Sequence, residues 1–249
     1  MQTLCVVLRF DGRAFCGWQV QKNGLSVMAV FQDALEAVLR ERPDIKGCSR
    51  TDAGVHAFRY YVSFKTSRII PPDRLVAALN SKLPKTVAAI DCFLRPEGFH
   101  ARYSAVGKQY RYLIFNTPLR DPFWEGLALF APKRLDAGQM EQQGQDFVGN
   151  HDFTSFCSAG SSVKDKMRTI YSFEVLRDGN RVECVVSGDG FLYNMVRIMV
   201  GTLLDIEGGR IEKGRIPNII GAKNRSLAGK TAPACALYLD DVFYNETEL

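Results

Sequence analysis

The side chains that could do chemistry lie in two short segments far apart in the chain. The first runs Arg50-Thr51-Asp52-Ala53-Gly54-Val55-His56-Ala57 and places a guanidinium and a carboxylate two residues apart, between two expected strands. An Asp shortly before a Gly is also typical of an ordinary turn, in which Asp52 bonds the nearby backbone and Gly54 takes a positive φ. From the residues alone, a structural turn and a functional loop are equally well supported.

A guanidinium interrupts the second segment, which is otherwise among the most apolar stretches of the chain. Arg197 stands in Asn194-Met195-Val196-Arg197-Ile198-Met199-Val200-Gly201, where the expected helix is apolar almost all round. Such a side chain either extends to the surface along its apolar stem or is buried beside an anion. In the buried case, a carboxylate would be its natural partner.

The elements that must position these residues follow the order β-α-β-β-α-β over the first hundred residues. Apolar and β-branched runs predict strands at 4–10, 45–48, 59–65 and 86–94. Apolar residues after Ser26 recur with the helical period up to Leu39, and Pro71-Pro72-Asp73 opens a second helix. This order is that of a ferredoxin-like, split βαβ sheet with helices on one face.

The rest of the chain follows the same order with larger insertions. Strands are predicted at 109–115, 170–176, 182–186 and 237–244, and helices at 135–147 and 191–206. The fold class is therefore predicted as α+β, with two ferredoxin-like domains, 1–104 and 105–249, related by pseudo-duplication. No residue-level repeat accompanies the shared order. We expect an active-site cleft between the two domains.

Composition and charge exclude several classes of protein. With 249 residues, 46% hydrophobic and 24% charged, the chain is expected to be folded and soluble. Its seven cysteines include no CxxC pair and its three histidines show no ligand spacing, so we expect no metal, no disulfide framework and a cytoplasmic location. No segment predicts an export signal or a membrane span. Residues 1–103 carry 15 basic against 9 acidic residues, a net of +6, and the rest carries 17 against 18, a net of −1, which is compatible with a polyanionic partner.

Taken together, these segments resemble the TruA-type tRNA pseudouridine synthases. The octapeptide at 50–57 matches the signature of that family, and further matching blocks extend in the same order over almost the whole chain. These blocks are Phe10-Asp11-Gly12, Phe15-Cys16-Gly17-Trp18-Gln19, Lys108-Gln109-Tyr110-Arg111-Tyr112, His151-Asp152-Phe153, Phe191-Leu192-Tyr193-Asn194-Met195-Val196-Arg197 and Leu237-Tyr238-Leu239.

The resemblance implies roles for five residues. Asp52 is implied as the catalytic aspartate and Arg197 as its partner. Tyr110 would lie against the target base, Arg50 beside the flipped nucleotide, and Leu237 in the wall of the pocket.

The activity that the resemblance implies is the isomerisation of uridine to pseudouridine in the anticodon stem-loop of tRNA, at positions 38–40, by a homodimer. The reaction breaks N1–C1′ and joins C5 to C1′, so it needs no redox cofactor, metal or added water. Asp52 could attack C1′, add to C6 of uracil or remove the 2′ proton. Each route needs its anion, which an adjacent Arg197 would favour. The target nucleotide must also leave the base stack.

Three positions depart from the common pattern of the family. Asn194 stands where many members have His, and Ala234 and Ala236 replace Pro and Gly before the last strand. A phosphate-binding loop at Gly229-Lys230-Thr231 is rejected, because the required earlier glycine is missing and Pro233 blocks the helix that should follow.

An alternative from another class is a catalytically silent RNA-binding module built from the same two domains. Asp52, Tyr110 and Arg197 count against it, because a pure binder has no use for a carboxylate directed at RNA.

Overall fold

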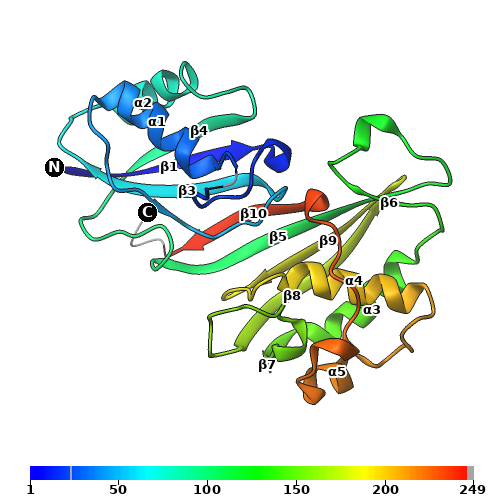
Figure 1. The fold of residues 1–249 in the computed structure, drawn as a ribbon. Coiled ribbons are helices and arrows are strands. Elements are labelled where there is room, and N and C mark those ends of the chain that lie inside the picture. Colours follow the sequence, from blue (N-terminus) through cyan, green and yellow to red (C-terminus); the bar gives the residue numbers. More distant parts are fainter. Residues whose placement is uncertain (23, 246–249) are drawn as a thin grey trace. The chain divides into compact units, whose positions relative to one another are not determined.

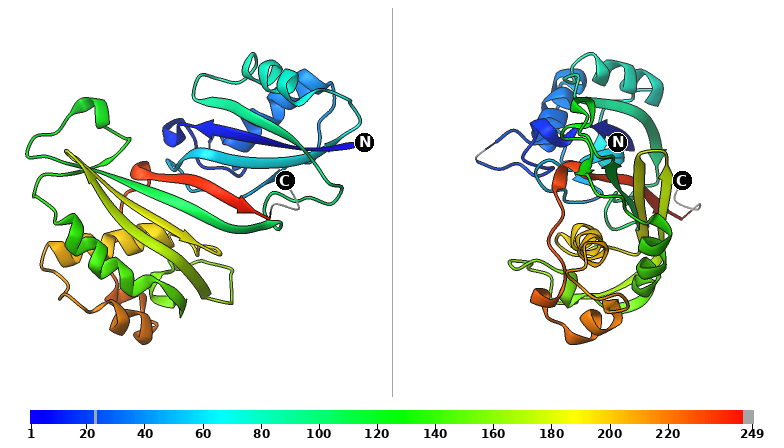
Figure 2. Two further views of the ribbon diagram at one scale, coloured as in Figure 1. Left: turned by 180° about the vertical axis from the view of Figure 1, so that it is seen from behind. Right: turned by 90° about the vertical axis from the view of Figure 1, so that its right-hand side faces the viewer.

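The computed structural model describes residues 1–22 and 24–245, which form two compact units (Figures 1 and 2). Unit 1 contains Met1–Val106 and the last strand from Tyr238 onward, and unit 2 contains Gly107–Leu237. Each unit consists of a sheet with helices packed on it, so the mixed α and β class predicted from the sequence is confirmed. Within the described residues, no helix is long and apolar enough to cross a membrane.

Unit 1 shows the predicted order of alternating strands and helices. Its elements are β1 (Gln2–Phe10), α1 (Val27–Leu39), β2 (Lys46–Gly47), β3 (His56–Thr66), α2 (Pro72–Asn80), β4 (Val87–Arg95) and β10 (Leu237–Tyr244). The strands β4, β1 and β3 are neighbours and antiparallel, and β2 pairs with β3 on its other side. The helices α1 and α2 lie together on one face of this sheet (Figure 1).

The first helix forms where the apolar period predicted it. The Ser26 side chain accepts a hydrogen bond from the backbone N–H of Ala29, and Arg40 ends the helix in the left-handed conformation at φ 56°. Its buried face includes Phe31 and Leu35, which are fully excluded from solvent. Burial of such side chains holds the helix on the sheet.

The last strand belongs to unit 1, whereas the predicted ranges 1–104 and 105–249 place it in the second domain. Tyr238 pairs with His56 and Leu239 with Ala57, so that β10 runs parallel to β3. Farther along, the carboxylate of Asp241 accepts hydrogen bonds from Arg59 Nε at 3.2 Å and from the Tyr61 hydroxyl at 3.0 Å. The local pattern of residues 237–244 specifies a strand, but it does not specify the sheet that the strand joins.

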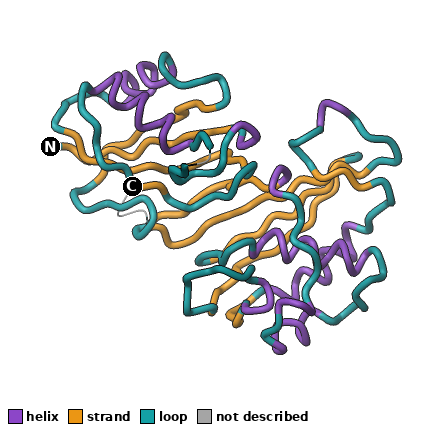
Figure 3. Tube along the Cα trace, viewed as in Figure 1, coloured by secondary structure: helices purple, strands orange, loops and turns teal. Residues whose placement is uncertain are grey.

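Unit 2 is built on the sheet order β5-β9-β8-β7, with β6 beside β5 (Figure 3). Its elements are β5 (Ala105–Asn116), β6 (Leu129–Ala131), α3 (Ala137–Gly144), β7 (Gly149–Asp152), β8 (Met167–Asp178), β9 (Arg181–Gly188), α4 (Met195–Glu207) and α5 (Ile216–Ala222). The predicted hairpin is present and longer than expected. The short elements β6, β7 and α5 were not predicted.

The helix predicted at 191–206 begins four residues later than the apolar run suggests. Asn194 has φ 61° and ψ 10°, a left-handed conformation that cannot be part of the helix, so α4 starts at Met195. The apolar residues before it form a turn, closed by a hydrogen bond from Met195 N–H to the carbonyl of Leu192.

Candidate active site

The loop that carries Asp52 connects β2 to β3 and is fixed by a second loop at residues 12–18. The backbone N–H of Trp18 donates to the carbonyl of Thr51 at 3.2 Å, and the N–H of Gly54 donates to the carbonyl of Phe15 at 3.3 Å. Two backbone hydrogen bonds therefore tie the loop down on either side of Asp52.

Two glycines allow the backbones of these loops to come this close. A Cβ at Gly17 would lie 2.3 Å from the carbonyl oxygen of Thr51, and a Cβ at Gly12 would lie 2.1 Å from that of Val55. Gly17 also has φ +102°, a conformation that other residues rarely adopt. Both glycines belong to sequence blocks on which the family resemblance rests.

Side chains anchor both ends of the Asp52 loop. At the start, the Tyr60 hydroxyl donates to the carbonyl of Ser49. At the end, the buried His56 accepts the N–H of Gly12 on Nδ1 at 3.1 Å, and its ring stacks on Tyr238 with 4.5 Å between the ring centres. Because Nδ1 accepts in this bond, the neutral ring carries its proton on Nε2.

The loop has the geometry of the turn that the sequence suggested. The carbonyl of Asp52 accepts the N–H of Val55 at 3.2 Å, and Gly54 takes φ +80°. The Asp52 side chain is half-buried, and the Arg50 side chain is exposed. The candidate site therefore includes this turn. The backbone of the turn determines the point from which the Asp52 side chain extends.

In unit 2, Tyr110 lies in the middle of strand β5. It pairs with Val186 on β9, and its buried ring meets Phe191 edge-on with 5.1 Å between the ring centres. Two residues on, the Tyr112 hydroxyl donates to the carbonyl of Pro233 at 3.0 Å. Burial raises the pKa of Tyr112, so this hydroxyl stays protonated and remains a donor.

Arg197 lies half-buried in the first turn of α4 and donates to two neutral oxygens. Its Nε donates to the carbonyl of Ala232 at 2.7 Å, and Nη1 donates to Oδ1 of Asn194 at 2.7 Å. In return, the N–H of Ala232 donates to the carbonyl of Arg197 at 3.1 Å. Neither alternative foreseen from the sequence, extension to the surface or burial beside an anion, included these two neutral acceptors.

The segment 229–233 packs directly against α4. A Cβ at Gly201 would lie 1.7 Å from the carbonyl oxygen of Lys230, so only glycine fits there. The N–H of Gly229 donates to Thr202 Oγ1 at 2.9 Å, and the N–H of Lys230 donates to the Asp205 carboxylate at 3.1 Å. The glycine of Gly229-Lys230-Thr231 thus serves close packing.

This segment contacts one of the five predicted residues and the strand of a second, and it leads along the chain to a third. Arg197 donates to the carbonyl of Ala232, and Tyr112, on the strand that carries Tyr110, donates to the carbonyl of Pro233. The chain then passes through a short 3-10 helix to the buried Leu237. Arg50 and Asp52 share the loop in unit 1. The anchoring roles of Ala232 and Pro233 could not be predicted from the sequence, because a backbone acceptor has no signature in the residue type.

The loop and the segment described above both lie within the part of the chain that matches a known family. The sequence profile of the tRNA pseudouridine synthase family matches residues 6–104 and 144–245. The chain belongs to this family. It is 39% identical over 246 residues to the tRNA pseudouridine synthase A of Staphylococcus aureus strain Newman, covering 99% of this chain and 92% of that protein. It is 41% identical over 245 residues to the tRNA pseudouridine synthase A of Ruminiclostridium cellulolyticum, covering 98% and 100%.

A solved structure, a Cbf5-Nop10-Gar1 complex, contains a chain that is similar at a TM-score of 0.40 and 13% identity. The match covers 97% of this chain and 59% of that one. At this score the likeness carries no argument about the fold.

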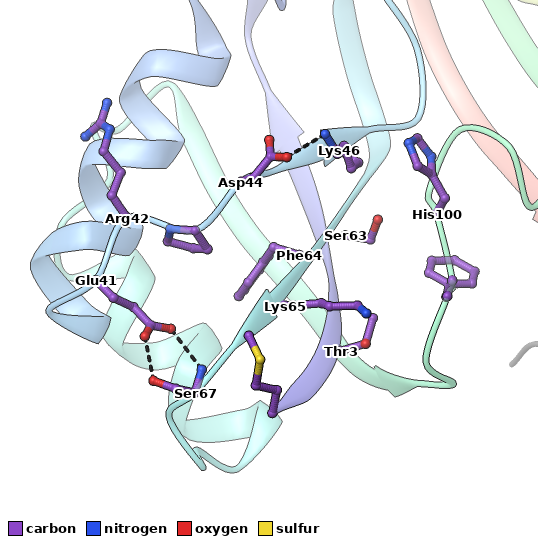
Figure 4. A pocket seen from close by; sticks show the side chains of 14 residues that line it. Thr3, Glu41, Arg42, Asp44, Lys46, Ser63, Phe64, Lys65, Ser67 and His100 are labelled. Carbon is purple, nitrogen blue, oxygen red and sulfur yellow. Dashed lines mark hydrogen bonds and ion pairs between the residues drawn. The ribbon is translucent and has the colours of Figure 1, made fainter.

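Unit 1 of this family member also has a groove of about 530 Å³, at the end of β3 opposite to the Asp52 loop (Figure 4). Phe64 lies in it, and two lysines line it. Lys46 pairs with Asp44 at 2.6 Å and Lys65 with Glu97 at 3.0 Å. Because carboxylates offset these cations, the groove is a poor site for a polyanion, and we assign it no part in the candidate active site.

Two glycine substitutions test whether the close contact at Gly17 determines the position of the Asp52 loop. Gly17 and Gly98 have φ +102° and +96°, so alanine adds similar backbone strain at both, about 1–2 kcal/mol. Only at Gly17 would the new Cβ clash, because nothing lies within 4 Å of it at Gly98. We expect Gly17→Ala to slow pseudouridine synthesis on tRNA by about tenfold to a hundredfold. Gly98→Ala should stay within about twofold of wild type, and equal rates for the two folded variants would contradict this account.

Proposed function

We propose that this protein isomerises uridine to pseudouridine in the anticodon stem-loop of tRNA, at positions 38–40, with Asp52 as the catalytic carboxylate. The observation that carries the proposal is the signature loop at 50–57, fixed by backbone contacts to residues 12–18, in a chain that belongs to the tRNA pseudouridine synthase family. The names of the two relatives support tRNA as the substrate.

The isomerisation requires little from the protein beyond a carboxylate anion held beside the target nucleotide. N1–C1′ breaks and C5–C1′ forms, the proton on C5 is lost, and N1 gains a proton, so the reaction is balanced without an oxidant or a cofactor. Asp52 begins it as the anion, by attack on C1′, by addition to C6 or by removal of the 2′ proton. Arg197 supplies the positive charge that favours this anion. Its contacts to Ala232 and Asn194 support the role, because both acceptors are neutral oxygens and do not themselves offset that charge.

The other three residues receive roles in binding the nucleotide. Tyr110 packs against the uracil, and its edge-on contact with Phe191 fixes the ring for that purpose. Leu237 forms part of the pocket wall. Arg50 is exposed and planar, and it occupies the place that the flipped nucleotide leaves in the stack.

The wider organisation belongs to the same proposal. Unit 2 contains β5, α3, β8, β9 and α4 in the order of the first five elements of unit 1, which supports two ferredoxin-like domains related by duplication. The cytoplasmic location is carried by the family resemblance and the cysteine pattern of the sequence. The alternative, a catalytically silent RNA-binding module, differs from this proposal in one observable. Such a module would bind tRNA and release it without any new pseudouridine.

The Asp52→Asn variant separates these two functions. The amide keeps the shape of the carboxylate and loses the anion, so we expect no pseudouridine while affinity for tRNA stays within several-fold. Release of tritium from tRNA labelled at C5 of uridine measures turnover, because that position loses its hydrogen. Retention of more than about a tenth of wild-type turnover, a barrier change below about 1.4 kcal/mol, would sink the catalytic assignment.

The Arg197→Met variant tests the electrostatic role of Arg197. Without the guanidinium the Asp52 carboxyl holds its proton to higher pH, so the acid limb of the pH–rate profile should move to higher pH. Arg177→Met is a matched control, because Arg177 also donates to an amide and a carbonyl oxygen, of Asn116 and Leu135. The control should lose stability and keep the wild-type profile. An acid limb that stays in place in Arg197→Met would contradict the role.

The homodimer is also part of the proposal, and an exposed apolar loop in unit 2 supports it. Leu119 and Phe123 are 80% and 89% exposed, and stacking of Trp124 on Phe115 fixes the base of their loop. We expect the wild type to sediment as a dimer at micromolar concentration and Phe123→Ser to shift toward monomer. Ile69→Ser, at an equally exposed site in unit 1, should not. A monomeric wild type would refute the dimer, and a dimeric Phe123→Ser would refute the location of its interface.

A further inference from the structure

Asn194 combines an unusual backbone with two side-chain contacts. It is one of three residues other than glycine with positive φ in the described part of the chain, and it immediately precedes α4. Asparagine tolerates the left-handed conformation better than most residues. Its carbonyl accepts the N–H of Ile198 at 3.0 Å, so the backbone of Asn194 is fixed to the first turn of the helix.

The two contacts of the amide have only one consistent orientation. Oδ1 accepts from Arg197 Nη1 at 2.7 Å, and Nδ2 donates to Ser158 Oγ at 2.9 Å. A guanidinium can only donate, so the oxygen of the amide must face it. The N–H of Ser158 donates to the carbonyl of Tyr193 at 3.1 Å, which holds the serine beside Asn194. Ser158 therefore fixes the orientation of the Asn194 amide, and the amide oxygen fixes the position of one edge of the Arg197 guanidinium.

Two titratable groups of unit 2 on which Arg197 acts carry no charge at neutral pH. Arg197 acts electrostatically on Tyr112 and Cys235, and burial raises the pKa of both. Beyond Ser158, the thiol of Cys157 lies 3.4 Å from Lys166 Nζ. The oxygens of Asn194 and Ala232 that accept from Arg197 are neutral, so these two hydrogen bonds orient the guanidinium without themselves offsetting its charge.

We propose that Asn194, held by Ser158, is a positioning residue that orients the Arg197 guanidinium as a neutral acceptor and so preserves its positive charge for the catalytic anion. This inference rests on the proposed function, because it needs Arg197 to act on a carboxylate. An acidic residue at position 194 would accept the same hydrogen bond but neutralise the guanidinium. A residue without a side-chain acceptor would leave Nη1 without its bond to Asn194.

Two substitutions of Asn194 separate orientation from charge. Asn194→Gly keeps the left-handed backbone and removes the acceptor, and we expect kcat to fall by about tenfold or more while KM for tRNA changes less than about threefold. Asn194→Asp keeps the acceptor and adds a carboxylate, so the acid limb of the pH–rate profile should move upward by about one pH unit. Ser158→Ala should give a smaller loss of kcat than Asn194→Gly.

Asn150→Asp is the matched control for the added charge. Asn150 is an exposed residue of unit 2 that also donates through its amide to a hydroxyl, that of Thr169, at 2.9 Å. The acid limb of the Asn150→Asp pH–rate profile should coincide with that of wild type. Thermal unfolding of every variant shows whether that variant is folded.

The proposal is overturned if the acid limb of Asn194→Asp coincides with those of wild type and Asn150→Asp. It is overturned equally if Asn194→Gly keeps kcat within about twofold of wild type. Asp52→Asn, measured beside these variants, distinguishes the two levels of failure. If Asp52→Asn is inactive and the Asn194 variants behave as wild type, only this inference fails, whereas an active Asp52→Asn removes the proposed function itself.

Discussion

The close approach of two backbones, residues 12–18 and 51–56, is the constraint on which the candidate active site depends. At Gly12 and Gly17 a single added carbon would lie 2.1 and 2.3 Å from carbonyl oxygens of the signature loop. Loops are usually among the more mobile parts of a protein, and side-chain contacts alone allow small shifts. Here backbone packing and hydrogen bonds define the loop, so that the carboxylate of Asp52 starts from a fixed position, which is what electrostatic catalysis requires.

Unit 2 uses the same device around Arg197. Gly201 in α4 admits the carbonyl of Lys230 where no side chain would fit, and the following residues Ala232 and Pro233 accept from Arg197 and Tyr112. A buried or half-buried cation is costly without partners. The neutral oxygens of Asn194 and Ala232 orient this one without themselves offsetting its charge. In each unit, close backbone packing that only glycine allows thus fixes the segment beside the candidate residue.

Much of the fold followed from the sequence, and the exceptions have physical causes. The helical period of α1 and the apolar, aromatic composition of β10 were enough to predict both elements. The predicted start of α4 was wrong, because an apolar run does not reveal the left-handed backbone of Asn194. The membership of β10 in unit 1 was also missed, because strand pairing joins residues 56 and 238, far apart in the chain.

For the site, residue types indicated Asp52 and Arg197 but not what holds them. Backbone acceptors such as the carbonyl of Ala232 leave no trace in composition, and the importance of Gly12 and Gly17 appears only when the opposing loop is in place. Roles for Arg50, Tyr110 and Leu237 remain predictions that rest on the family resemblance.

The activity proposed for this chain is the conversion of uridine to pseudouridine in the anticodon stem-loop of tRNA. Its most direct measurement is a nucleotide-resolution map of pseudouridine, by chemical labelling and primer extension, in unmodified tRNA incubated with the purified protein. The account predicts new pseudouridine at positions 38–40 and at no uridine outside the anticodon stem-loop. An unchanged map, or pseudouridine confined to other regions of the tRNA, would contradict it.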